Sequence, residues 1–233
     1  HNVVLAKDNK TFIDNSSSVN KPNSAALRKI NGEFITWLEE NKLDDSHPLT
    51  PFLTDLAQPE YGTITAEDGQ VMHYRLFKPT NMAKGKKHPV IVNVYGGPHA
   101  QRVTNSWRSK NLYFQYMAQQ GYVIFQLDNR GSYNRGKKFE DAIYKKLGVV
   151  EVADQIKGVE FLRTLDYVDP ARIGIYGHSY GGYMALMTMF KAGDYFSAGV
   201  SGAPVTDWAL YDTHYTERYL GHPDTNAQGY TDS

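Results

Sequence analysis

The chain has 233 residues, with 25 Lys and Arg against 25 Asp and Glu, and it contains no cysteine. This length suffices for one large hydrophobic core, or for one core and part of another. The balanced charge gives no reason to expect a nucleic-acid partner. The lack of cysteine excludes disulfides, a thiolate nucleophile and cysteine metal ligands. The longest apolar runs, such as 122–125, are far too short to span a bilayer.

The first fifty or so residues have the pattern of antiparallel strands, with no helix signal. The segment Thr11-Phe12-Ile13-Asp14 runs into a polar stretch at 15–23. Two short strands, 27–30 and 33–38, are then predicted on either side of Asn31-Gly32, because Asn-Gly is typical of tight hairpin turns. Prolines from residue 48 onward indicate a linker. We therefore expect residues 1–56 to form a separate antiparallel segment and linker.

From residue 57 to the end, predicted strands alternate with predicted helices. The strands are 61–66, 71–79, 89–95, 122–127, 172–176 and 196–201, and the helices are 111–120, 149–165 and 181–191. Two of the strands, 89–95 and 122–127, are almost continuously apolar, as expected of strands that are buried on both faces. The alternation predicts an α/β fold with a doubly wound, mostly parallel sheet.

A serine stands in a glycine frame between one of these strands and the helix that follows it. Gly177-His178-Ser179-Tyr180-Gly181 matches the Gly-x-Ser-x-Gly pattern of a nucleophile elbow. The pattern alone is weak, since a tight strand-to-helix turn can hold a serine by chance. The strand before it and the helix after it strengthen the interpretation. We predict that Ser179 is a nucleophile, and that the neighbouring His178 is a wall residue and not the catalytic base.

A serine enzyme that transfers acyl groups needs two hydrogen-bond donors for the oxyanion. The backbone N–H of Tyr180, the residue after the nucleophile, is one candidate. In the loop that follows strand 89–95, the phenol of Tyr95 is another, because Pro98 has no N–H to donate. Tyr95 can equally be a packing residue at the end of the strand. The residues alone leave both roles open.

Four segments together resemble the prolyl oligopeptidase family, and more narrowly its dipeptidyl peptidase IV branch of the bacterial type. They are GHSYGGYM at 177–184, VYGGP at 94–98, DNRGS at 128–132 and YTERYLG at 215–221. The resemblance implies that residues 57–233 are the first two-thirds of an α/β-hydrolase catalytic domain. It also implies that residues 1–56 end a β-propeller. The chain therefore looks truncated relative to the family.

The resemblance implies a serine exopeptidase that removes dipeptides with Pro, or less well Ala, in second position. Ser179 would be the nucleophile, and Tyr95 with the Tyr180 N–H would form the oxyanion hole. The family's pocket for the proline side chain maps onto Tyr180, Val205, Trp208, Tyr211 and Tyr215. Aromatic faces bury the compact, apolar proline ring well. If 205–215 is helical, the last four of these residues lie roughly on one face, although such a stripe is more often core packing.

The catalytic aspartate and histidine have no matching positions in this sequence. In this fold they follow the serine after two further strands, and the 28 residues beyond Val205 are too few for those strands. A makeshift triad of Asp207 or Asp212 with His214 or His222 is disfavoured, because all four precede the loops that overhang the serine. We therefore expect this chain alone to be inactive and to need the remainder of the same protein.

Other interpretations stay open beside the exopeptidase. One is an esterase or acyl-peptide hydrolase of the same fold, and another is a non-catalytic scaffold that keeps the elbow. No cofactor or metal is expected, since His214 and Glu217 are two ligands without a third. The expected partner is a peptide substrate, a homodimer is conceivable, and neither nucleic acid nor a membrane span is expected. The resemblance implies a periplasmic or extracellular location, and the incomplete sheet implies an exposed apolar edge.

Overall fold

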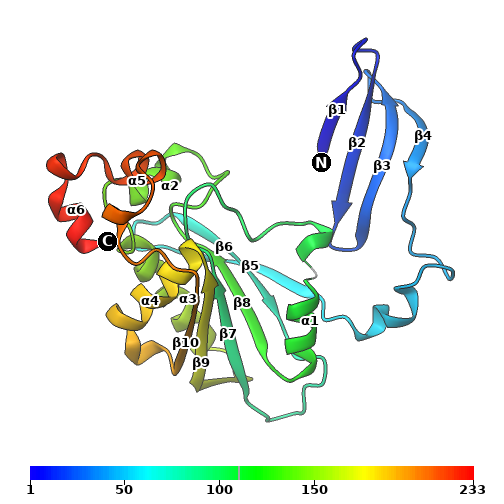
Figure 1. Cartoon of the computed structure of the whole chain (residues 1–233). Helices are drawn as coiled ribbons and strands as arrows, with labels where there is room; N and C mark the ends of the chain where they lie inside the picture. Colours follow the sequence, from blue (N-terminus) through cyan, green and yellow to red (C-terminus); the bar gives the residue numbers. More distant parts are fainter. Residues whose placement is uncertain (110) are drawn as a thin grey trace. The chain divides into compact units, whose positions relative to one another are not determined.

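The computed structural model describes residues 1–109 and 111–233. Within these residues the chain divides into two compact units (Figure 1). The first consists of His1–Pro59 together with Thr104–Gln115, and the second of Glu60–Val103 together with Tyr116–Ser233. The division of the sequence into a propeller end at 1–56 and a catalytic domain at 57–233 stays a prediction.

The first unit is built on a four-stranded antiparallel sheet, called sheet A. Its strands follow chain order: β1 (Asn2–Leu5), β2 (Thr11–Ser18), β3 (Lys21–Lys29) and β4 (Phe34–Glu39). The predicted hairpin around Asn31-Gly32 is confirmed, since β3 and β4 pair antiparallel and Gly32 has a φ of +91°. A 3₁₀ helix, η1 (Thr50–Asp55), follows in the predicted linker.

The polar stretch 15–23, which carries no apolar strand signal, lies mostly within these strands. Ser16 of β2 pairs with Ser24 of β3, and the turn between the strands is only Val19-Asn20. Both strands are held here by backbone pairing, so the polarity of the side chains does not prevent strand formation. Hydrophobicity alone therefore underestimated the length of this hairpin.

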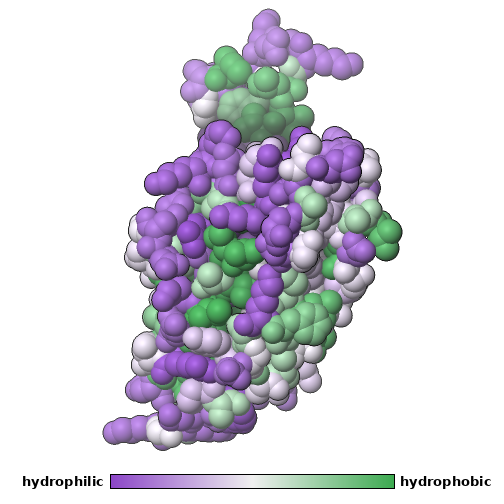
Figure 2. Space-filling view, turned by 90° about the vertical axis from the view of Figure 1, so that its left-hand side faces the viewer, coloured by the Kyte–Doolittle hydropathy of each residue, from purple (hydrophilic) through white to green (hydrophobic). Residues whose placement is uncertain are grey.

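Sheet A leaves much of its apolar surface uncovered. Figure 2 shows hydrophobic residues on the upper, paler part of the molecule, where sheet A lies. The large apolar side chains that are exposed on β1, on β4 and near the turn before β4 are Val3, Val4, Leu5, Ile30, Phe34, Ile35 and Leu38. By contrast, Ala26 is among the few fully buried apolar residues of this sheet.

The second unit contains a six-stranded mixed sheet, called sheet B, with the order β10-β9-β7-β8-β6-β5. Its strands are β5 (Pro59–Thr65), β6 (Val71–Phe77), β7 (His88–Val94), β8 (Val123–Asp128), β9 (Val168–His178) and β10 (Ala198–Gly202). The four strands β10, β9, β7 and β8 run parallel, and β6 pairs antiparallel with β8. The predicted mostly parallel sheet is confirmed.

Three helices connect the strands as the alternation predicted: α1 (Leu112–Gln119), α3 (Val150–Arg163) and α4 (Tyr180–Lys191). Three further helices were not predicted: α2 (Lys137–Glu140), α5 (Thr213–Leu220) and α6 (Ala227–Asp232). Short 3₁₀ helices lie before or between them: η2 (Trp107–Ser109), η3 (Asp141–Ile143), η4 (Gly193–Tyr195), η5 (Trp208–Leu210) and η6 (Pro223–Thr225). Figure 1 shows α3 and α4 side by side on one face of sheet B, where α4 packs on β9 and β10.

The core of the second unit lies between sheet B and these two helices. Valine and isoleucine side chains of the central strands, including Val90, Val123 and Ile175, meet Val159 of α3 and Met184 of α4. All are almost fully buried, as the continuous apolar runs predicted. The strand β10 forms one edge of the sheet, and its Val200 is 60% exposed. No helix of the described residues is long and apolar enough to cross a membrane.

Candidate active site

Ser179 lies at the sharp turn between β9 and α4. Its backbone has φ +60° and ψ −123°, a conformation that residues other than glycine rarely adopt. Two hydrogen bonds hold the turn: the Ser179 N–H donates to the Gly202 carbonyl at 2.9 Å, and the Ser179 carbonyl accepts from the Tyr183 N–H at 3.0 Å. This is the strained strand-to-helix geometry of a nucleophile elbow.

The glycines around the serine are required by close backbone contacts. A Cβ on Gly177 would lie 2.1 Å from the Gly181 carbonyl oxygen, and one on Gly181 would lie 2.3 Å from the Val94 oxygen. One on Gly182 would lie 2.5 Å from the Gly202 oxygen. Any side chain here would therefore push the turn away from strands β7 and β10. The glycine frame in the sequence has a steric cause.

The hydroxyl of Ser179 has no hydrogen-bond partner within residues 1–109 and 111–233, and the residue is half-buried at the amino end of α4. The carboxylates weighed for a makeshift triad have other roles. Asp207 accepts from the Ala209 N–H at 2.8 Å, and Asp212 accepts from the Tyr215 N–H at 2.8 Å, so both cap helices. His222 likewise accepts from the Asp224 N–H at 3.3 Å. His178 is exposed.

The loop after β7 is fastened by the carboxyl end of the neighbouring strand β8. Asn129 donates through Nδ2 to the Gly96 carbonyl at 2.9 Å. Asp128 accepts from the backbone N–H groups of Arg102 and Val103, each at 2.9 Å. The segment DNRGS, which carried part of the family resemblance, therefore holds the backbone next to Tyr95 in place.

Tyr95 and the Tyr180 N–H, the two predicted oxyanion donors, are both free to donate. Tyr180 is the first residue of α4, so its N–H has no acceptor within the helix. The Tyr95 hydroxyl has no hydrogen-bond partner among the described residues. Burial raises the pKa of the Tyr95 phenol, while the Arg102 guanidinium, 4.7 Å from the ring centroid, partly opposes this rise. The phenol therefore keeps its proton at neutral pH, as a donor must.

Aromatic rings gather next to the serine. Trp208 stacks on Tyr215 with ring centroids 6.0 Å apart, and Tyr211 meets Tyr215 edge-on at 5.5 Å. Tyr180 lies 5.6 Å from Trp208 and 6.0 Å from Tyr95, measured between ring centroids. The four aromatic residues predicted to bind proline thus form one cluster, which reaches Tyr95 through Tyr180. Their roles stay predictions.

Residues 205–215 do not form the single helix on which a shared face of these residues would depend. Val205 lies before the short helix η5, Trp208 begins η5, and Tyr215 belongs to α5, with a break at Tyr211. Asp207 and Asp212 cap the two helices and cause this division. The rings converge because the chain turns between the helices. Val205 is partly buried against the core.

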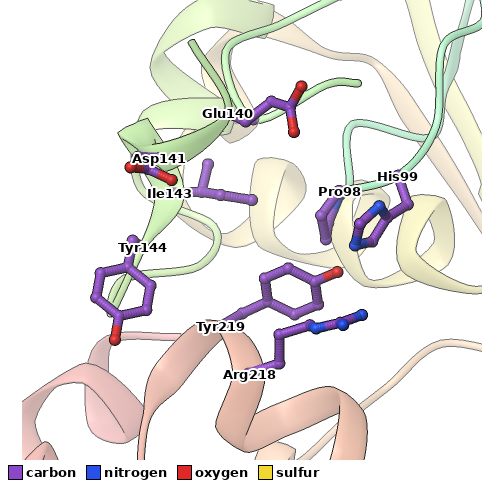
Figure 3. A pocket seen from close by; sticks show the side chains of 9 residues that line it. Pro98, His99, Glu140, Asp141, Ile143, Tyr144, Arg218 and Tyr219 are labelled. Carbon is purple, nitrogen blue, oxygen red and sulfur yellow. The ribbon is translucent and has the colours of Figure 1, made fainter. Parts of the chain in front are cut away.

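A cavity of about 220 Å³ continues from this cluster (Figure 3). Pro98 and His99 on one side belong to the segment that follows β7 and Tyr95, and Tyr219 points into the cavity from α5, one turn after Tyr215. Glu140 and Arg218 add opposite charges to its lining. The cavity therefore adjoins the candidate site and is lined by both charged and apolar residues.

Sequence reasoning missed several buried polar residues that support the site. Asn129 fastens the Tyr95 loop, and Glu151 accepts a hydrogen bond from the Tyr180 hydroxyl at 2.6 Å. Arg130 forms an ion pair with the buried Asp154 at 2.6 Å. The sequence offered little signal for these residues. Asn129 and Arg130 are polar residues directly after a buried strand, and Glu151 lies between two valines at the start of a helix.

His214 and Glu217, weighed as metal ligands, lie one turn apart on α5. The described residues contain no group of three or more His, Cys, Asp or Glu side chains that could hold a metal ion.

The parallel sheet, the elbow and the helix behind it define an α/β-hydrolase. The chain belongs to the prolyl oligopeptidase family, whose model matches residues 107–233, more than half of its length. Dipeptidyl peptidase 8 of Mus musculus is 38% identical over 99% of this chain, which spans 26% of that relative.

Two solved bacterial structures have the same fold. Dipeptidyl peptidase 4 of Porphyromonas gingivalis matches 99% of this chain with a TM-score of 0.88 and 32% identity. A Bacteroides ovatus protein assigned as a dipeptidyl aminopeptidase IV matches 100% of it with a TM-score of 0.90 and 42% identity. This chain spans 32% of each solved chain. The expected α/β-hydrolase fold, preceded by an antiparallel segment, is confirmed.

Proposed function

We propose that this chain carries the nucleophile, the oxyanion hole and the proline pocket of a serine exopeptidase that releases X-Pro and, less well, X-Ala dipeptides. The observation that supports it most is the convergence of three features around one turn. Ser179 stands at the elbow, Tyr95 and the Tyr180 N–H are unbonded donors beside it, and the aromatic cluster adjoins them. The similarity to dipeptidyl peptidases gives the substrate class.

In this proposal the Ser179 hydroxyl attacks the carbonyl carbon of the proline residue, and a general base takes the hydroxyl proton and passes it to the leaving amine. The oxyanion that forms accepts hydrogen bonds from Tyr95 and from the Tyr180 N–H, which stabilise the charge as it develops. Collapse of this intermediate releases the shortened peptide and leaves an acyl-enzyme, which water then hydrolyses. The flat faces of Trp208 and Tyr215 select for the proline ring.

The attack needs a general base that these residues do not supply. We propose that the catalytic aspartate and histidine come from further residues of a longer polypeptide. This chain spans about a quarter of the length of its curated relative dipeptidyl peptidase 8. The same longer protein would recognise the amino terminus of the peptide. We also propose a periplasmic or extracellular location, which a fusion of the natural protein to a compartment-sensitive reporter would test.

Hydrolysis of a Gly-Pro anilide tests the function. The natural polypeptide that contains this chain should cleave it, and Ser179→Ala should abolish cleavage. The purified 233-residue chain should not cleave it, because no base stands at Ser179. A fluorophosphonate should label the natural polypeptide at Ser179. Turnover by the short chain that depends on Ser179 would refute the need for further residues, and labelling at another serine would refute the assignment of the nucleophile.

A further inference from the structure

Glu151 is a fully buried carboxyl close to the candidate site. It lies in the first turn of α3 with 0% of its surface exposed, although it belongs to none of the groups used in the chemistry above. Burying a carboxylate is costly unless hydrogen bonds compensate for the lost water. Its Oε1 accepts from the Tyr180 hydroxyl at 2.6 Å and from the Gly148 N–H at 3.0 Å. Tyr180 therefore supplies the side-chain hydrogen bond to Glu151, beside backbone N–H groups.

The proton in this pair stays on the tyrosine. Burial is the largest cause that raises the pKa of Tyr180 well above its ordinary value, and the nearby Glu151 raises it further. Burial also raises the pKa of Glu151, although hydrogen bonds from Tyr180 and from backbone N–H groups oppose this rise. The position at the amino end of α3 adds the favourable field of the helix. The tyrosine is thus the donor and the glutamate the acceptor.

The Tyr180 ring touches both halves of the candidate site. On one side it packs so closely against the Tyr95 loop that a Cβ on Gly97 would lie 2.5 Å from its Cγ. On the other side it meets Trp208 at 5.6 Å between centroids. Its backbone end is held at the elbow beside Ser179, and its hydroxyl end is held by Glu151. A rotation of this ring would alter the pocket and the loop together.

We propose that Glu151 is a positioning residue that fixes the Tyr180 ring and so sets the preference for proline over alanine in the pocket. The inference rests on the proposed function, because the preference exists only if the aromatic cluster binds that side chain. Glu151 itself touches no reacting atom. A second consequence reaches the oxyanion side, since the same ring packs against the loop that carries Tyr95.

The test uses the natural polypeptide with three variants and one control. Glu151→Leu removes the acceptor, Tyr180→Phe removes the donor but keeps the ring, and Glu151→Gln keeps an acceptor without charge. Glu160→Gln is the matched control, because Glu160 is an exposed residue on the same helix that forms an ion pair with Lys157. The measurements are kcat/KM for Gly-Pro and Gly-Ala anilides, the rate of fluorophosphonate labelling at Ser179, and the melting temperature.

We expect Glu151→Leu and Tyr180→Phe each to lower the ratio of Gly-Pro to Gly-Ala activity by roughly tenfold, about the worth of one charge-assisted hydrogen bond. The double variant should lose little more than either single variant, because both remove one shared interaction. Glu151→Gln should stay within about threefold of the unaltered protein, as expected when an acceptor is kept. Labelling at Ser179 should slow in Glu151→Leu and Tyr180→Phe and change little in Glu151→Gln. Glu160→Gln should match the unaltered protein in every measurement.

An unchanged ratio and labelling rate with a lowered melting temperature would show that Glu151 only stabilises the fold, and would overturn the proposal. If Glu151→Leu does not fold, Tyr180→Phe decides by the same criteria. If the unaltered protein labels at Ser179 but cleaves neither anilide, the exopeptidase function fails. The labelling rates then decide whether Glu151 still positions the ring. Absence of labelling in the unaltered protein removes both proposals.

Discussion

Every residue of β8 in sheet B is buried, whereas every residue of β1 in sheet A is exposed. Helices α3 and α4 cover one face of sheet B, and backbone contacts around Ser179 are so close that only glycine fits at three positions. Sheet A has paired strands and a tight turn but little buried apolar surface. Strand pairing alone can thus define a sheet, but only close packing defines a site.

The largest expected effect comes from filling the glycine frame. We expect Gly177→Ala to destabilise the second unit by about 3 kcal/mol or more, or to prevent it from folding, because the added Cβ meets backbone atoms that cannot move independently. Gly193→Ala is the control, since a Cβ there meets no atom within 4 Å. Urea denaturation measures both. Equal midpoints for the two variants would contradict the steric role of Gly177.

Removing one oxygen from the site tests chemistry separately from packing. In the natural polypeptide, Tyr95→Phe should lower kcat by ~10²–10³, because an oxyanion donor acts most strongly in the transition state. KM and the melting temperature should change little, since the ring remains. Tyr116→Phe, at an exposed tyrosine of α1 outside the candidate site, is the control. A kcat within about threefold of the unaltered protein would show that Tyr95 is a packing residue, because an oxyanion donor is worth far more.

Opening the aromatic cluster should reduce specificity without abolishing activity. Trp208→Ala or Tyr215→Ala should lower kcat/KM for a Gly-Pro anilide. The corresponding loss of transition-state stabilisation should be at most a few kcal/mol, roughly the value of one large aromatic contact. Trp208 is only 3% exposed, so its loss also weakens the core, whereas Tyr211, at 42% exposed, separates the two effects. If Gly-Pro and Gly-Arg anilides respond equally to Tyr211→Ala, these residues do not form the proline pocket.

The smallest effect is expected in sheet A. Val4→Thr, at a side chain 51% exposed, should change the free energy of unfolding by no more than about 0.5 kcal/mol. The same substitution at Val123, 0% exposed in sheet B, buries a new hydroxyl and should cost about 1–3 kcal/mol. Thermal denaturation compares the two. A cost at Val4 as large as that at Val123 would mean that the exposed face of sheet A is covered in solution.

The sequence alone determined the alternation of strands and helices in the second unit and the elbow at Ser179. Both depend on local patterns, because buried strands need continuous apolar residues and a strained turn needs glycines beside it. The hairpin at Asn31-Gly32 likewise depends on a local pattern, because Asn-Gly favours a tight turn. The extension of β2 and β3 through polar residues was not foreseen, since backbone pairing there does not depend on apolar side chains.

Only the tertiary structure decided which side chains meet. Val205, Trp208, Tyr211 and Tyr215 would share one face only if 205–215 were a single helix, but they belong to separate segments, and Asp207 and Asp212 cap the two helices. Glu151 and Tyr180 are 29 residues apart in the chain and meet because α3 and α4 pack together. A carboxylate in a helical pattern normally faces solvent, and its burial becomes favourable only when a distant donor satisfies it. Such a pairing leaves no local trace in the sequence.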